Sequence, residues 1–203
     1  GQLFLKRVFD FTVSSLMLAV LSPVLAVLAV LIRLDSEGPV FYRQERVTQY
    51  GRKFRIYKFR TMVQDADKKG SLVTTQGDAR ITRIGKKLRG CRLDELPQLI
   101  NIWKGEMSFV GTRPEVVKYV KQYTDEMYAT LLLPAGVTSE ASVQFKDEDQ
   151  RIAAGVEAGR SADEVYVEDV LGEKMEINLK ELKEFSMAGN VKTMIRTVRA
   201  VTK

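Results

Sequence analysis

The most constraining feature of this sequence is an uncharged apolar run from Phe11 to Ile32, which is 22 residues long. As a single helix the run would extend about 33 Å, enough to cross the hydrocarbon core of a bilayer. A cleaved signal peptide and a buried core helix are the alternatives, but the run is longer than is typical of either. The run therefore predicts a membrane-embedded helix near the N-terminus.

Ser22 and Pro23 lie in the middle of this run and argue against a plain spanning helix. Pro23 lacks the N–H that would bond to the carbonyl of Ala19, so a kink is expected, and the Ser22 hydroxyl can satisfy a freed carbonyl. Basic residues flank the run on both sides, and positive residues favour the cytoplasm. We expect residues 1–35 to form a re-entrant helix-break-helix, with a proline-containing spanning helix as the alternative.

The remaining residues, 36–203, predict an α/β fold that is mostly helical with a small β hairpin or sheet. Residues 40–47 and 53–62 favour the hairpin, and the polar residues 64–80 favour a loop. Helices are expected at 82–89, 94–103, 115–131, 147–158, 162–171 and 176–200. The last of these carries an apolar stripe that can pack on the core or rest on lipid headgroups as an interfacial amphipathic helix.

Charge is distributed unevenly along the chain. Residues 1–122 carry 22 Lys and Arg against 11 Asp and Glu, a balance of +11, whereas residues 123–203 have a balance of −5. The basic part suits an anionic partner such as nucleic acid, a phosphorylated small molecule or an anionic membrane face. Because the chain has no histidine and a single cysteine, His-ligated zinc and imidazole catalysis are excluded, and any metal must use oxygen ligands.

Two adjacent carboxylates, Asp94 and Glu95, follow a run of six Lys and Arg residues that begins at Arg80 and includes Arg89 and Arg92. One interpretation is structural: Asp94 caps the next helix and Glu95 is favourable in its first turn. The other is chemical, because cations around a carboxylate form a phosphate-binding environment. There the carboxylate can hold Mg²⁺ or attack a phosphate as a nucleophile.

A second candidate for anion binding is Arg113. It precedes Pro114, which can open a helix at its first position. A helix N-terminus beside an arginine is a ready anion site. The plainer interpretation is a strand, a turn and a helix with an arginine on the surface.

Three segments together resemble the bacterial sugar transferase family, the monotopic phosphoglycosyl transferases that start glycan assembly on polyprenol phosphate. They are KFRTM at 58–62, LDELPQ at 93–98 and MSFVGTRPE at 107–115. The similarity covers about residues 1–145 and is greatest to the Campylobacter-type members that use UDP-diacetylbacillosamine in protein N-glycosylation. The family's Gly-Pro-Arg-Pro is here Gly-Thr-Arg-Pro at 111–114, and its Pro-Gly-Ile-Thr-Gly is replaced at 134–139.

The resemblance implies a reaction with a covalent intermediate. Asp94 would attack the β-phosphate of a UDP-sugar, UMP would leave, and polyprenol phosphate would then attack the aspartyl ester. Glu95 would assist, and Mg²⁺ would be the cofactor with Asp94 as its ligand. The residues that would bind the substrates and their phosphates are Lys58, Arg60, Arg80, Arg89, Gln98 and Arg113.

The resemblance also implies a location and partners. Residues 36–203 would be a cytoplasmic catalytic domain, with the family core at 36–145 and an acidic, helical C-terminal part at 146–203. The protein would be monotopic, on the cytoplasmic face of the bacterial inner membrane, and its partners would be a UDP-sugar, undecaprenyl phosphate and the membrane, without nucleic acid. The alternative is a non-catalytic, membrane-tethered basic module that binds nucleic acid or anionic lipid.

Overall fold

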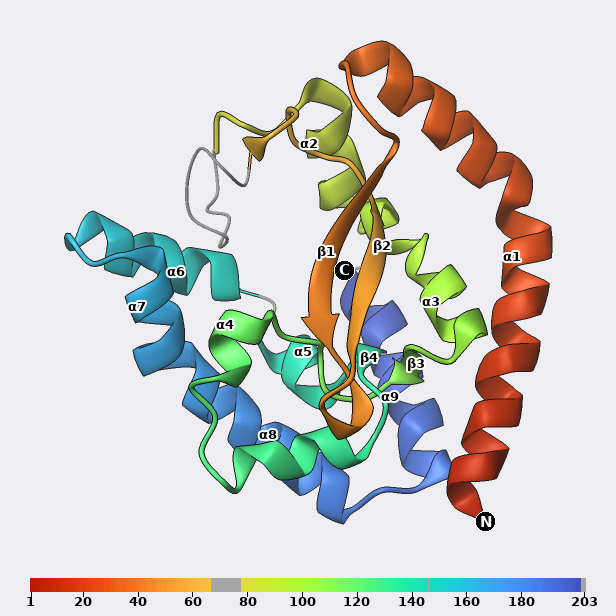
Figure 1. Ribbon diagram of the computed structural model, residues 1–203, viewed down its shortest axis with the longest axis vertical. Helices are drawn as coiled ribbons and strands as arrows, with labels where there is room; N and C mark the ends of the chain where they lie inside the picture. Colours follow the sequence, from red (N-terminus) through yellow and green to blue (C-terminus); the bar gives the residue numbers. More distant parts are fainter. Residues whose placement is uncertain (67–77, 146, 202–203) are drawn as a thin grey trace.

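A hairpin of two antiparallel strands occupies the middle of the molecule in a computed structural model that describes residues 1–66, 78–145 and 147–201. The strands are β1 (Phe41–Val47) and β2 (Lys53–Phe59), joined by a 3₁₀ turn. Figure 1 shows the helix α1 (Gln2–Asp35) along one side of this hairpin and helices α6 (Glu148–Glu157) and α7 (Ala162–Val165) on the other. The predicted hairpin is confirmed, whereas most of the predicted polar loop lies outside the described residues.

The N-terminal apolar run folds into one continuous helix, α1 (Gln2–Asp35). The helix is not interrupted at Pro23, because the Ser22 hydroxyl donates a hydrogen bond of 2.8 Å to the carbonyl of Ala19. This bond replaces the one that the proline cannot make. The ribbon bends along its length instead, and its second half leans over the rest of the chain (Figure 1). The expected helix-break-helix is therefore a bent but uninterrupted helix.

The first half of α1 is attached to the rest of the chain by polar contacts. Lys6, Asp10 and Ser14 recur at intervals of four residues and are buried on one helix face. The Lys6 ammonium donates to the carbonyl of Val110 at 2.9 Å, and Asp10 accepts a hydrogen bond of 3.3 Å from the backbone N–H of Phe109. Two charged side chains of α1 are thus buried against the strand at Ser108–Val110.

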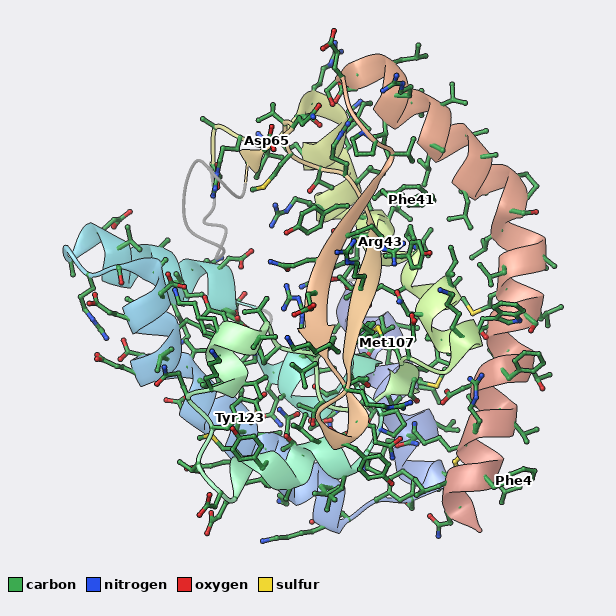
Figure 2. All side chains as sticks on the ribbon, viewed as in Figure 1. Phe4, Phe41, Arg43, Asp65, Met107 and Tyr123 are labelled. Atoms are coloured by element: carbon green, nitrogen blue, oxygen red, sulfur yellow. The ribbon has the colours of Figure 1, made fainter. Side chains whose placement is uncertain are left out.

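The second half of α1 packs through apolar side chains. Ile32 is buried in a cluster with Phe59 and Leu88. The outward face of the whole helix is apolar as well. At the N-terminal end of α1, Figure 2 shows Phe4 pointing away from the molecule. The helix is long and apolar enough to cross a membrane, and most of its apolar window is exposed. Its exposed apolar side chains include Leu16, Val20, Val24, Val27, Val30 and Leu34.

Short helices and a second small sheet make up the rest of the described chain. The bounds are α2 (Arg83–Gly90), α3 (Gln98–Lys104), β3 (Ser108–Val110), α4 (Val117–Val120), β4 (Gly136–Thr138), α5 (Glu140–Gln144), α6 (Glu148–Glu157), α7 (Ala162–Val165), α8 (Gly172–Lys183) and α9 (Met187–Val201). Strands β3 and β4 are parallel. 3₁₀ turns lie at Leu93–Glu95 and Met127–Leu132, and a π-helical stretch at Tyr166–Leu171 joins α7 to α8. The mostly helical class with small sheets is confirmed.

Two of the expected helices are each divided into two elements. The predicted helix at 115–131 is divided into α4 and a 3₁₀ turn, because the chain turns so that Tyr119 and Tyr123 both enter the core. The predicted helix at 176–200 is two helices, α8 and α9. The Ser186 hydroxyl accepts a hydrogen bond of 3.1 Å from the backbone N–H of Gly189 and so starts the second helix.

Candidate active site

Glu95 ends the 3₁₀ turn at Leu93–Glu95 and binds two cations from distant parts of the sequence. Its Oε1 accepts hydrogen bonds from Lys58 Nζ at 2.9 Å and from Arg113 Nη2 at 2.6 Å. Burial by itself would raise the pKa of Glu95. The charges of Arg113 and Lys58 and their hydrogen bonds outweigh burial and hold this pKa well below its usual range. Glu95 is therefore an ionised anchor for both cations.

Asp94 is adjacent in sequence but has different surroundings. Its side chain is largely buried, and no described side chain donates a hydrogen bond to its carboxylate. Burial raises the pKa of Asp94, the charge of Lys58 opposes that rise, and the neighbouring Glu95 adds to it. The expected helix cap is wrong, because α3 begins only at Gln98. The Asp94 carboxylate is thus free to meet a substrate or a cation.

Arg92 directs this turn. Its backbone has a φ of 55°, in the left-handed region, which costs a residue other than glycine about 1–2 kcal/mol. The unusual conformation lies between the end of α2 and the 3₁₀ turn, and the two carboxylates that follow it, Asp94 and Glu95, line the same pocket. Strain of this kind is concentrated at sites where side chains must be aimed.

A polar pocket of about 240 Å³ lies beside the two carboxylates. Its lining comes from segments that are far apart in the sequence: β2, the end of α2, the turn before α3, the residues after β3, and α5, α6 and α8. The lining residues are Lys58, Arg89, Arg92, Asp94, Glu95, Arg113, Ser142, Glu148, Asp149 and Lys174. The lining has five cations and four carboxylates, and Lys58, Arg113 and Lys174 are paired with two of those carboxylates. Cations held in place in this way form an environment for a substrate that carries negative charge.

Arg113 is positioned by its neighbours in the chain. Before it, Gly111 approaches Gly136 so closely that a Cβ on Gly136 would lie 2.2 Å from a backbone atom of Gly111. After it, the carbonyl of Pro114 accepts a hydrogen bond of 3.0 Å from the buried Arg46. The expected helix start at Pro114 is wrong, because α4 begins at Val117. Arg113 therefore acts through its own guanidinium and without a helix N-terminus.

The structure brings together most of the predicted site residues. Lys58, Arg89 and Arg113 line the polar pocket with the two carboxylates, and Gln98 is buried beside them in the wall of an adjoining apolar cavity. Arg60 and Arg80 are placed elsewhere.

These two arginines have structural contacts. Arg60 donates a 2.6 Å hydrogen bond to the carbonyl of Ser36 and so holds the end of α1. Arg80 pairs with Asp78 at 2.6 Å and donates to the carbonyl of Ala66 at 2.9 Å. Their expected contact with substrate phosphate has no support in the lining of the pocket, because both side chains are directed to other partners.

Sequence reasoning missed several lining residues of the pocket. Lys174 on α8 is buried and donates to Glu148 at 2.9 Å, and Asp149 and Ser142 lie beside them. Only Arg92 had a signal, because it belongs to the basic run before the carboxylates. The other missed residues lie in α5 and in the acidic C-terminal part, where no local sequence pattern indicated a binding site.

The oxygen ligands of the site suit a cation that is bound together with substrate. Among the described residues, no three Asp, Glu, Cys or His side chains are grouped closely enough to hold a metal by themselves. Glu95 is occupied by Lys58 and Arg113, so Asp94 is the carboxylate of this pair that remains. Mg²⁺ is commonly held by one or two carboxylates and by phosphate oxygens of the substrate. The residues therefore fit Mg²⁺ bound with a diphosphate.

Comparison with known families identifies the family of this chain. The family described as bacterial sugar transferase matches residues 1–203. The chain belongs to the bacterial sugar transferase family. The resemblance carried by the three short segments is thereby confirmed at the level of the family.

Individual relatives within the family are longer than this chain. It is 36% identical over 202 residues to the UDP-N-acetylgalactosamine-undecaprenyl-phosphate N-acetylgalactosaminephosphotransferase of Aeromonas hydrophila, covering 98% of this chain and 44% of that protein. It is 32% identical over 198 residues to the UDP-glucose:undecaprenyl-phosphate glucose-1-phosphate transferase of Escherichia coli, covering 96% and 39%. A Caulobacter vibrioides protein with the latter name is 32% identical over 196 residues, covering 95% and 68%. The chain thus spans less than half of the first two relatives.

Proposed function

We propose that this bacterial sugar transferase moves a sugar phosphate from a UDP-sugar to undecaprenyl phosphate and releases UMP. The observation that carries the proposal is the contrast inside the carboxylate pair. Glu95 holds Lys58 and Arg113 in place, and Asp94 beside it has no partner among the described side chains. The names of the relatives agree with a reaction between a UDP-sugar and undecaprenyl phosphate.

The proposed reaction has two displacements at one phosphorus atom. An Asp94 carboxylate oxygen attacks the β-phosphorus, the bond to the bridging oxygen breaks, and UMP leaves with that oxygen and its electron pair. A phosphate oxygen of the acceptor then attacks the same phosphorus, and Asp94 leaves as a carboxylate. The products are polyprenol diphosphate sugar and UMP, and no proton transfer is needed, which agrees with a chain that has no histidine.

The cations of the pocket would stabilise the charge that moves during both steps. Lys58 and Arg113 are already oriented by Glu95, so they need little rearrangement when a diphosphate binds. Mg²⁺, when bound, would neutralise part of the diphosphate charge. Asp94 is the proposed ligand, because it is the carboxylate of the pair that the two cations leave free.

We propose a monotopic arrangement at the cytoplasmic face of the bacterial inner membrane, with α1 entering the bilayer and returning. Both halves of α1 contact the rest of the described chain, through Lys6 and Asp10 before the proline and through Ile32 after it. A straight span would carry one half away from these contacts. The exposed apolar face of α1 would then lie in lipid.

Accessible cysteines would test this topology in intact cells. Phe4→Cys and Leu34→Cys, each in a Cys91→Ser background, use positions that are 71% and 79% exposed at the two ends of α1. We expect an impermeant maleimide added from the periplasm to label neither. Labelling of one end only would indicate a spanning helix.

The donor that we propose is UDP-diacetylbacillosamine, in the first membrane step of protein N-glycosylation. The support is the resemblance of the motif-bearing segments to members that use this sugar. The relatives named above act on N-acetylgalactosamine and glucose donors, so a panel with UDP-diacetylbacillosamine, UDP-N-acetylgalactosamine, UDP-N-acetylglucosamine and UDP-glucose is needed. The donor with the highest kcat/KM identifies the sugar.

UMP release from purified protein tests the proposed reaction. We expect UMP to form with a UDP-sugar, Mg²⁺ and undecaprenyl phosphate, and at most one equivalent to form before the acceptor is added. Intact-protein mass spectrometry should then find a phosphosugar on Asp94. Absence of UMP with every donor, together with retention on heparin or DNA, would favour the non-catalytic basic module.

A further inference from the structure

A second cavity, of about 420 Å³, adjoins the polar pocket and has a different lining. Its walls come from α1, α3, β3, β4, α5 and α9. They include Met17, Leu99, Phe109, Val143, Thr197 and Ala200. The volume is in the range of small-molecule sites, which are mostly apolar with a few polar groups.

The cavity and the polar pocket are continuous in their lining. Arg92, Glu95, Arg113 and Ser142 belong to both. A single molecule can therefore place an anionic end among the cations of the polar pocket and an apolar part in the cavity. We infer that the cavity binds the first isoprene units of the polyprenyl phosphate acceptor, an inference that rests on the function proposed above.

One polar side chain in the apolar wall is evidence for a ligand that has an oxygen atom at the boundary between the cavity and the polar pocket. Gln98 is 1% exposed, and its amide nitrogen has no hydrogen-bond partner among the described residues. A buried amide without a partner is costly and uncommon in folded proteins. Gln98 lines the cavity together with Glu95 and Arg113, so an acceptor that bridges the two regions would bring an ester oxygen to the boundary where this amide lies.

The walls of the cavity connect it to surfaces that suit lipid. Met17 belongs to α1, whose neighbouring side chains Leu16 and Val20 are exposed. α9 carries exposed Ile195 and Val198. A prenyl chain can follow these apolar surfaces from the membrane. A UDP-sugar has no long apolar part to match them, so the acceptor is the better occupant.

α9 is a fixed wall of this cavity. Thr197 donates to the carbonyl of Thr193 at 2.9 Å, so the Thr138 hydroxyl is the donor in the 2.7 Å bond between Thr138 and Thr197. Arg196 pairs with Glu140 on α5 at 2.8 Å. Filling the cavity from α9 or α5 should therefore exclude the ligand and leave the helices where they are.

Two variants that fill the cavity test this inference. We expect Ala200→Phe and Val143→Phe each to raise the KM for undecaprenyl phosphate at least tenfold. The KM for the UDP-sugar and the UMP released before acceptor addition should stay unchanged. Lys192→Phe, on the exposed side of α9, is the matched control and should behave as wild type. A raised KM for the UDP-sugar instead would assign the cavity to the donor and overturn the inference, as would unchanged kinetics.

A crosslinking experiment on the unaltered protein does not depend on how the variants fold. A prenyl phosphate with a diazirine on its second isoprene unit should label peptides that contain Met17, Val143 or Ala200. Labelling confined to other surfaces would overturn the inference. Labelling of the cavity in a protein that releases UMP from no donor would instead contradict the proposed function and leave the binding site standing.

Discussion

The polar pocket and the apolar cavity share a wall but satisfy their buried polar groups differently. In the pocket, Lys58 and Arg113 are paired with Glu95, and the buried carboxylate of Asp94 beside it has no described partner. In the cavity, Gln98 has an amide nitrogen without one. Folded proteins satisfy nearly all such groups, so an unsatisfied one at the wall of a cavity calls for an explanation such as a bond supplied by a ligand. The difference teaches that the charged residues are gathered in the pocket and at the shared wall, and the rest of the cavity is mostly apolar, as an amphiphilic substrate requires.

The largest expected effect comes from Asp94→Asn, which removes the unpartnered charge and keeps the shape of the side chain. Turnover should fall by at least about 10³-fold, because the nucleophile is lost. The melting temperature should be unchanged or higher, because a buried charge without a pairing cation is removed. Steady-state UMP release and thermal unfolding check both parts.

Glu95→Gln is the matched control, since it makes the same change one residue later. It should lower the free energy of unfolding by about 1–3 kcal/mol, because Lys58 and Arg113 lose their shared partner. If the two variants changed the melting temperature alike, the contrast between the two carboxylates would be wrong.

Arg113→Lys should have the next largest effect. Lysine keeps the charge but loses the planar set of donors, so it cannot bind Glu95 and a phosphate in the same way. We expect kcat/KM to fall about 10- to 100-fold. Arg80→Lys is the control, because Arg80 pairs with Asp78 away from the pocket, and should change kcat/KM less than about twofold. If both variants lost the same factor in kcat/KM, the position of Arg113 in the polar pocket would not explain its effect.

The pH dependence of the first step separates the two carboxylates again. Asp94 must be ionised to attack, and its pKa is raised above that of an ordinary aspartate, so activity should be lost as the pH falls through that raised pKa. The loss should approach about tenfold per pH unit. Glu95, with its lowered pKa, stays charged over that range. An acid limb at the usual pKa of an exposed aspartate would contradict this assignment.

The smallest expected effect is that of Gln98→Met, which removes the amide from the wall between the two regions. The KM for undecaprenyl phosphate should rise about 2- to 10-fold through loss of one hydrogen bond. The melting temperature should not fall, because an unsatisfied buried group is replaced by an apolar one of similar size. A drop in melting temperature would show that Gln98 supports the fold instead of a ligand.

Features that depend on local sequence were predicted well. The 22-residue apolar run, the hairpin, α2 and the Ser22 hydrogen bond to Ala19 follow from hydropathy, turn chemistry and missing backbone donors within a few residues. Membership of the bacterial sugar transferase family was also evident in short contiguous segments. The buried face of α1 had a readable signal that was missed, because Lys6, Asp10 and Ser14 recur every fourth residue.

By itself, the sequence determined which charged residues stand near the pair Asp94 and Glu95 along the chain, and only the tertiary structure decided which of them bind it. Lys58 and Arg113 reach Glu95 from β2 and from the turn after β3, whereas Arg80, nearer in sequence than either, is turned toward Asp78. α9 becomes a cavity wall through bonds to distant strands and helices. Such contacts depend on how the chain closes in space, and the periodicity of a segment carries information only about its own faces.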